Sequence, residues 1–250
     1  MNVTGPNNTL IEACCGSFDD VKAVAAHGVR RVELNSSLFL GGLTPTVGSV
    51  ALVHELIDIE IVSMIRPREG GFMYSDMEFQ TMLRDITALS HAGADAFVFG
   101  VLNPDGTIDM KRNRTLIEQA DGKPCVFHRA FDVVPDRRVA LEQLVELGFV
   151  RVLTTGGCAD VREAVDHISG LIRQAGSRIT VLPGGVKPYF AADFVRQTQA
   201  TELHVAQFTT HVDPSCDGNN VIHFGGALHP SETRVSRFDG DWLNGFGASS

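Results

Sequence analysis

The sequence predicts an α/β fold with a single (β/α)8 TIM barrel, and the repetition of one local pattern is the main reason. Residues 26–34, 91–99 and 146–154 each combine the end of a helical pattern, a glycine suited to the left-handed C′ position and a short apolar strand. Residues 201–206 resemble a fourth copy without the glycine. Four further apolar runs bring the expected strands to eight: residues 10–15, 59–65, 125–127 and 179–182.

Helix-length segments separate nearly all of these strands, which implies parallel strands joined by right-handed crossovers. Ser75 and Glu78 form a candidate capping box at the start of the clearest helix. Eight such units in about 250 residues match the size of a TIM barrel. A doubly wound open sheet is the alternative, but it would not need eight evenly spaced strands. Five segments have helical patterns: residues 17–26, 75–91, 136–147, 160–175 and 187–198.

One domain is expected, with an N-terminal tail at residues 1–9 and a barrel body at residues 10–206. Residues 207–250 form a loop-rich segment that completes the same domain. This segment contains no convincing amphipathic helix, so we expect a shortened or missing last helix, with at most one turn at residues 241–246. A neighbouring subunit would then cover the apolar surface left there, which predicts a homo-oligomer, either a dimer or a tetramer.

Composition and charge limit the possible partners. The formal net charge of −9 argues against nucleic acid and anionic membranes as partners, although arginines can still gather locally around a small anion. No apolar run approaches about 20 residues, so no membrane span is expected. The cysteines are odd in number and the N-terminus lacks a secretory pattern, which together predict a reduced, cytoplasmic protein.

Side-chain alternation along the strands places ionisable groups inside the barrel. The apolar sets of the strands should pack against the helices, and the opposite sets should point inward. A barrel built only for stability fills its interior with branched apolar side chains, and buried charges are costly without partners. The predicted interior therefore indicates function, with mutual neutralisation of the charges as the alternative. The inward set is Glu12, Cys14, Glu33, Asn35, Met64, Arg66, His128, Glu202 and His204.

The loops after the strands supply candidate anion-binding groups, because TIM barrels bind their ligands at the C-terminal ends of the strands. Arg66 and Arg68 follow the third strand, and glycine-rich turns follow the sixth and seventh. At the rim, Arg129 and Asp132 are expected to pair and brace their loop. The candidate substrate- or anion-binding residues are Arg66, Arg68, Arg129, Asp132, Thr155, Gly156, Gly184, Gly185 and His204.

A series of motifs runs in order from about residue 10 to residue 204: Ile11-Glu-Ala-Cys14, Arg31-Val-Glu-Leu34, Gly41-Gly-Leu-Thr-Pro45, Met64-Ile-Arg-Pro-Arg68, Tyr74-Ser-Asp76, Phe99-Gly-Val-Leu102, Phe127-His-Arg-Ala-Phe-Asp132 and Arg151-Val-Leu-Thr-Thr-Gly156. Together they resemble the CutC family, the copper homeostasis proteins. The resemblance implies a single TIM barrel, cytoplasmic and oligomeric, that takes part in copper handling and binds copper. It does not imply a particular reaction.

One position departs from the family pattern. Family members proposed to bind copper have a cysteine on the first strand, which Cys14 matches, and often a second one directly after the second strand. Asn35 occupies that second position, where Cu(I) would favour a soft ligand. Cys15 should face the helix layer, and Met64 or Cys158 is a possible second soft ligand. Cys14 is therefore the candidate metal ligand, and a buried thiol without a metal is the alternative that we weigh more heavily.

Three hypotheses follow. The first is a copper homeostasis protein that binds Cu(I) through the inward thiol of Cys14. The second is an enzyme acting on a small anionic or phosphorylated substrate, with His128 as general acid/base, Glu33 or Glu12 assisting, and an anion site at Arg66, Arg68 and Gly184. The third is a scaffold whose charges neutralise one another. Whether the chain is an enzyme stays open on the sequence alone.

Overall fold

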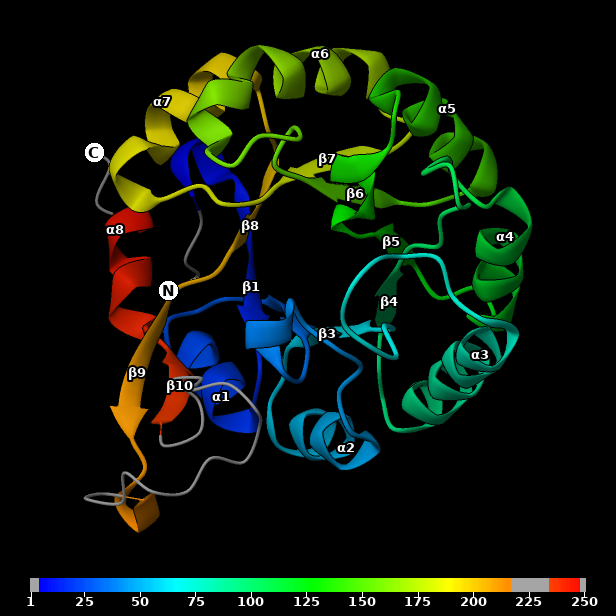
Figure 1. The fold of residues 1–250 in the computed structure, drawn as a ribbon. Coiled ribbons are helices and arrows are strands. Elements are labelled where there is room, and N and C mark those ends of the chain that lie inside the picture. The colour runs from blue at the N-terminus through cyan, green and yellow to red at the C-terminus, as the bar shows by residue number, and fades with distance from the viewer. Residues whose placement is uncertain (1–4, 217–233, 248–250) are drawn as a thin grey trace.

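The structure is a computed structural model, and it describes residues 5–216 and 234–247. Eight parallel strands form a barrel surrounded by helices (Figure 1), as the sequence predicts. Hydrogen bonds join neighbouring strands in the order β7-β6-β5-β4-β3-β2-β1-β8, and a parallel bridge between Gly184 and His204 links β7 to β8. The strands are β1 (Leu10–Cys15), β2 (Arg31–Leu34), β3 (Glu60–Met64), β4 (Ala96–Phe99), β5 (Cys125–Phe127), β6 (Arg151–Thr154), β7 (Thr180–Pro183) and β8 (Glu202–Val205).

Seven helices connect consecutive strands, and each packs on the outside of the barrel (Figure 1). Five of them match the predicted segments to within a few residues, and the Ser75–Glu78 capping box is present. Residues 160–175 divide into a 3-10 turn (Val161–Ala164) and a helix. The helices are α1 (Phe18–Ala26), α2 (Val47–Leu56), α3 (Asp76–His91), α4 (Met110–Gln119), α5 (Arg137–Leu147), α6 (Val165–Ala175) and α7 (Pro188–Thr198).

Helices α2 and α4 are not among the predicted segments, and their sequences explain this. Helix α2 contains Gly48 and several valines, which have low helix propensity. Helix α4 is mostly polar, and Asn113 and Leu116 are its only buried residues. The N-cap residues of these helices are Thr46 and Asp109, and each side chain accepts a hydrogen bond from a backbone N–H of the first turn. These two residue types are the sequence signal that could have predicted where the helices begin.

The C-terminal segment completes the barrel wall without a long helix. An antiparallel hairpin of β9 (Phe208–Val212) and β10 (Arg234–Phe238) leads to a 3-10 turn (Gly240–Leu243) and the four-residue α8 (Asn244–Gly247). These elements lie between α7 and α1 (Figure 1). The prediction of a shortened last helix is therefore confirmed.

Our expectation that apolar surface would be left exposed beside this segment is wrong. Phe238, Leu243 and Phe246 are buried, and the backbone N–H of Phe238 donates to Asp20 of α1 at 2.8 Å. The chain thus covers this surface itself, because the hairpin and the 3-10 turn pack where an eighth helix would otherwise lie. Exposed apolar side chains occur instead on α2, at Val47, Leu52 and Leu56.

The barrel interior has two unlike halves. On one side, Val62, Met64, Ala96, Val98 and Val126 form a small apolar cluster of their own, separate from the main core between strands and helices. On the other side, β1, β2 and β8 carry charged side chains into the interior. No helix among residues 5–216 and 234–247 is long and apolar enough to cross a membrane.

Candidate functional site

A buried ionic network lies at the N-terminal ends of β1, β2, β6 and β8. The Arg31 side chain donates to Glu12 at 2.7 Å and also pairs with Glu202. Arg151 donates to the same Glu202 oxygen at 3.0 Å and lies 3.9 Å from Glu60. The two arginines neutralise the charges of Glu12 and Glu202, which strand alternation predicts to point inward. Arg31 and Arg151 are not among the site residues predicted from the sequence, although Arg31 shares the inward parity of Glu33.

His204 connects this network to the middle of the barrel. Its Nδ1 donates to the Glu12 carboxylate at 2.8 Å, and both side chains are buried. Burial alone would lower the pKa of His204, but the Glu33 carboxylate, Cys14 and Glu12 raise it well above its usual value. Burial alone would raise the pKa of Glu12, but His204 and Arg31 lower it. The pair is therefore an imidazolium hydrogen-bonded to a carboxylate, with His204 Nε2 left for a ligand.

Cys14, Glu33 and His204 come together as one cluster. Cys14 Sγ lies 3.9 Å from Glu33 Oε1, and one ligand atom from each of the three residues lies within 4.8 Å of the others. In the part of the chain that the structure describes, this is the only group of three or more His, Cys, Asp or Glu side chains that could hold a metal ion. From the sequence, these residues had three separate predicted roles, as metal ligand, catalytic group and anion-binding group.

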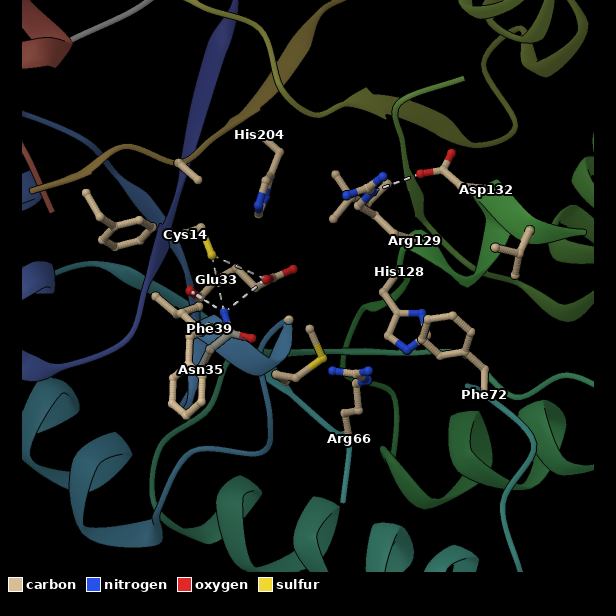
Figure 2. A pocket seen from close by; sticks show the side chains of 17 residues that line it. Cys14, Glu33, Asn35, Phe39, Arg66, Phe72, His128, Arg129, Asp132 and His204 are labelled. Carbon is tan, nitrogen blue, oxygen red and sulfur yellow. Dashed lines mark hydrogen bonds and ion pairs between the residues drawn. The ribbon is translucent and has the colours of Figure 1, made fainter. Parts of the chain in front are cut away.

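Asn35 supports this cluster. Its Nδ2 donates to Glu33 Oε1 at 3.0 Å and to Cys14 Sγ at 3.6 Å, and its side chain points inward as predicted (Figure 2). Cys15 packs in the outer core, also as predicted. Among the described residues, Cys158 does not belong to the metal-competent group, whereas Met64 lines the same cavity as Cys14.

Burial raises the pKa of both Cys14 and Glu33. It raises the pKa of the Cys14 thiol to about 12, with the Glu33 charge adding to the effect and His204 opposing it. Burial also raises the pKa of Glu33 above its ordinary value, against the opposing influence of His204. At neutral pH, Cys14 is therefore a protonated thiol that a cation would have to ionise.

The cluster faces a cavity of about 590 Å³ at the C-terminal end of the barrel. This is within the range of small-molecule sites. Arg66 and His128, two of the predicted site residues, also line the cavity (Figure 2). Glu12 lies beneath this site and reaches it only through His204. Apolar walls are supplied by Leu38, Phe39, Met64, Phe72, Val133 and Leu153.

Arg66 and His128 are both buried, and Phe72 packs on both. Arg66 donates to the backbone carbonyls of Leu40, Gly42 and Gly70 at 2.9–3.0 Å. The His128 Nδ1 accepts the backbone N–H of Ala130 at 3.2 Å, which places the ring proton on Nε2. Burial and the charge of Arg66 lower the pKa of His128 to about 3. His128 is therefore a neutral hydrogen-bond donor, and this state does not favour the general acid/base role that we predicted for it.

The glycine-rich loop after β6 does bind a carboxylate, but it is one of the chain's own. Asp132 accepts hydrogen bonds from the backbone N–H of Thr155 at 3.1 Å and of Gly157 at 3.2 Å. Arg129 pairs with the same carboxylate at 2.8 Å, so the predicted rim pair is present. Gly156 N–H donates to the Thr154 hydroxyl. The N–H groups of this loop are thus already occupied.

Three other predicted residues lie away from the cavity lining. Arg68 pairs with Glu78 at 2.6 Å and bonds the carbonyls of Glu69, Gly71 and Met73. Both Arg66 and Arg68 follow the end of β3 at Met64, where strand alternation no longer fixes side-chain direction, and the pair with Glu78 holds Arg68 outside the cavity. Gly184 and Gly185 follow β7 beside Thr155 and also lie outside the lining.

The histidines of the C-terminal segment do not join the site in the described part of the chain. His211 is exposed on β9 and contacts Thr209. His223 and His229 lie outside the described residues.

Comparisons with known proteins agree with this architecture. A model of the CutC family matches residues 9–209. The chain is 44% identical over 229 residues to a CutC family protein of Treponema denticola, covering 91% of this chain and 93% of the other. It is 38% identical over 227 residues to the copper homeostasis protein cutC homolog of Homo sapiens, covering 90% and 83%.

A solved structure gives the same result. The crystal structure of a copper homeostasis protein CutC from Streptococcus agalactiae superposes with a TM-score of 0.76 at 33% sequence identity, covering 79% of this chain and 98% of the other. The matched family region, residues 9–209, includes all eight barrel strands and the Cys14–Glu33–His204 cluster. The chain belongs to the CutC family.

Proposed function

We propose that this chain is a copper homeostasis protein that binds a copper ion through Cys14, Glu33 and His204. The observation that carries the proposal is the convergence of three donor side chains from β1, β2 and β8, with ligand atoms within 4.8 Å of one another. Atoms 2.0–2.3 Å from one ion are separated by about this distance or less. Thiolate and imidazole are both suitable copper ligands.

The surroundings of the cluster also support a cation. A ligating histidine commonly donates its other ring N–H to a carboxylate, as His204 does to Glu12. Ionised Cys14 and Glu33 would place two negative charges side by side, and burial disfavours both. A bound cation would offset that cost. Asn35 then replaces the second family cysteine as a support, since its amide N–H group contacts both donors.

The ligand set can be tested by X-ray absorption on the full-length protein loaded with Cu(I) under anaerobic conditions. We expect one sulfur ligand together with nitrogen or oxygen ligands. Cys14→Ala should lose the sulfur scattering, and Cys15→Ala is the matched control because Cys15 faces the outer core. Sulfur scattering retained in Cys14→Ala, or lost in Cys15→Ala, would contradict the proposal.

A second candidate function is an enzyme acting on a small anionic or phosphorylated substrate. It is favoured by the cavity that Arg66 and His128 share with Glu33, whose raised pKa suits proton transfer. The test is a screen of carboxylated and phosphorylated metabolites for conversion, followed by proton NMR, with Glu33→Gln as the variant. A conversion that Glu33→Gln leaves unchanged would rule out this role for Glu33.

We further propose that the protein works in the cytoplasm as a homo-oligomer. Four cysteines among the described residues are free thiols, which suits a reducing compartment. The exposed apolar side chains of α2 supply a surface for self-association. Light scattering on Leu56→Glu and wild type tests the oligomer, and a wild-type mass equal to that of one chain would contradict it.

A further inference from the structure

Arg66 is a buried cation without a carboxylate partner. Only 6% of its surface is exposed, and among the described residues its guanidinium forms no ion pair: it donates to the backbone carbonyls of Leu40, Gly42 and Gly70 and lies beside the Tyr74 hydroxyl. The other buried arginine, Arg31, contrasts with it because it pairs with Glu12 and Glu202. An uncompensated charge at such depth is costly, so the position of Arg66 on the cavity wall calls for an anion.

His128 supplies a second donor beside it. Its Nδ1 is taken by the backbone N–H of Ala130, and its Nε2 is buried without a hydrogen-bond partner among the described residues. A buried N–H without a hydrogen-bond partner is destabilising, so a ligand oxygen that accepts from His128 Nε2 would remove that cost. A neutral imidazole held in this tautomer acts as a fixed donor toward an oxygen atom.

The two groups belong to one part of the cavity. The Phe72 ring lies 4.8 Å from the His128 ring, and the Arg66 guanidinium carbon lies 5.5 Å from the centre of the same Phe72 ring. Figure 2 shows Arg66 and His128 side by side on the wall opposite Cys14. Both groups line the same cavity as the metal-competent cluster.

We propose that Arg66 and His128 form a binding site for the carboxylate group of a small organic ligand. One guanidinium matches one negative charge, and the His128 N–H adds a neutral donor. A phosphate group would need more donors, but the backbone N–H groups of the nearby loop are bound to Asp132. The apolar side chains of Met64, Phe72 and Leu153 suit the organic part. This ligand site goes beyond the copper proposal and does not depend on it.

Calorimetric titration of the full-length protein with benzoate tests this inference, with benzamide and inorganic phosphate as comparison probes. Benzoate should bind saturably, and benzamide, which has the same shape without the charge, should bind at least about tenfold more weakly. In ¹⁵N-labelled protein, benzoate should shift the His128 Nε2–H resonance. Phosphate binding more tightly than benzoate would overturn the ligand class, and failure of benzoate to bind would overturn the site.

Two substitutions of His128 isolate its donor. His128→Asn keeps an acceptor near the Nδ1 position for the Ala130 N–H but lacks the distal donor, so it should weaken benzoate binding about tenfold. His128→Gln places an amide N–H near the Nε2 position and should bind benzoate like wild type. Equal affinities in His128→Asn and wild type would overturn the assignment. Arg66→Ala would also remove the hydrogen bonds to the carbonyls of Leu40, Gly42 and Gly70 and disturb their loops. The role of charge is therefore tested with benzamide and not with this substitution.

One further variant separates this site from its alternatives. Arg68→Gln should bind benzoate like wild type, because Arg68 bonds Glu78 outside the cavity. The titrations use metal-free protein, so a failure of the copper proposal leaves this result intact. Loss of benzoate binding in Arg68→Gln would contradict the proposed position of the carboxylate.

Discussion

Glu12 accepts a 2.8 Å hydrogen bond from Nδ1 of His204 in the barrel interior, across 192 residues of sequence. The pairing joins β1 to β8 and orients the His204 ring so that Nε2 remains for Cys14, Glu33 and a ligand. Beneath it, Arg31 compensates the charge of Glu12. The geometry of the candidate metal site thus depends on an ionic network that does not itself line the cavity.

Glu12→Gln should weaken copper binding by about tenfold to a hundredfold, the usual effect of removing a carboxylate that orients a metal-binding histidine. Competition with a Cu(I) chelator measures this. Glu60→Gln is the matched control, because Glu60 lies at the partly exposed outer end of the same network. An equal loss of affinity in both variants would mean that Glu12 acts only through overall charge.

Arg31→Met should lower the free energy of unfolding by about 3–5 kcal/mol, since it leaves Glu12 and Glu202 buried without their shared partner. Urea denaturation measures this loss. Arg178→Met is the control, because its pair with Glu142 is about half exposed and should contribute little to stability. Similar losses in the two variants would refute a special role for the Arg31 network.

Copper binding should release protons. The Cys14 thiol has a pKa of about 12 and the pKa of His204 is well above its usual value, so both groups carry protons at neutral pH. A metal must displace them, so about two protons should be released per ion and the affinity should rise with pH. Calorimetry in buffers of different ionisation enthalpy counts them. Cys14→Ala should release about one proton fewer, and an affinity independent of pH would contradict the assigned ligands.

The neutral state of His128 predicts a loss of stability in acid. Its pKa is about 3 in the folded chain and about 6.5 when unfolded, so the unfolded state binds the extra proton first as the pH falls. Stability should therefore decrease below about pH 6.5 until about pH 3. Between pH 7 and pH 5, the free energy of unfolding of wild type should fall by about 2 kcal/mol relative to that of His128→Gln. A difference between the two proteins that does not change with pH would contradict this.

Asp132→Asn should loosen the loop after β6 without weakening copper binding. The carboxylate accepts hydrogen bonds from the Thr154 hydroxyl, the Thr155 and Gly157 N–H groups and Arg129. The free energy of unfolding should therefore fall by about 1–3 kcal/mol. Hydrogen exchange should accelerate at the Thr155 and Gly157 amides. Asp160→Asn is the control, because Asp160 caps the following 3-10 turn and pairs with Arg162. Unchanged exchange in Asp132→Asn would show that the loop keeps its structure without this carboxylate.

Much of the fold could be predicted from the sequence because strand and helix periods are local signals. Alternation gave the inward direction of Cys14, Glu33 and His204 correctly. It gives neither the height of a side chain along the barrel axis nor its neighbour across the closing strands, so it did not predict that these three residues meet. That contact depends on the pairing of β8 with β1, which aligns Glu12 with His204.

Other parts of the site depend on contacts that local patterns do not contain. Arg66 and Arg68 look equivalent in sequence, yet only Arg66 lines the cavity, because Glu78 on α3 holds Arg68. The loop at residues 154–157 has the composition of an anion site, and its bound anion is Asp132 of the same chain. The neutral state of His128 follows from its tertiary burial and the adjacent Arg66 charge.

The central claim is that Cys14 is a copper ligand in this barrel. The most direct test is an anaerobic Cu(I) titration of wild type, Cys14→Ala and Cys15→Ala against a competing chelator. We predict one tightly bound ion in wild type and in Cys15→Ala, and an affinity at least about tenfold lower in Cys14→Ala. Equal affinities in wild type and Cys14→Ala would contradict the claim.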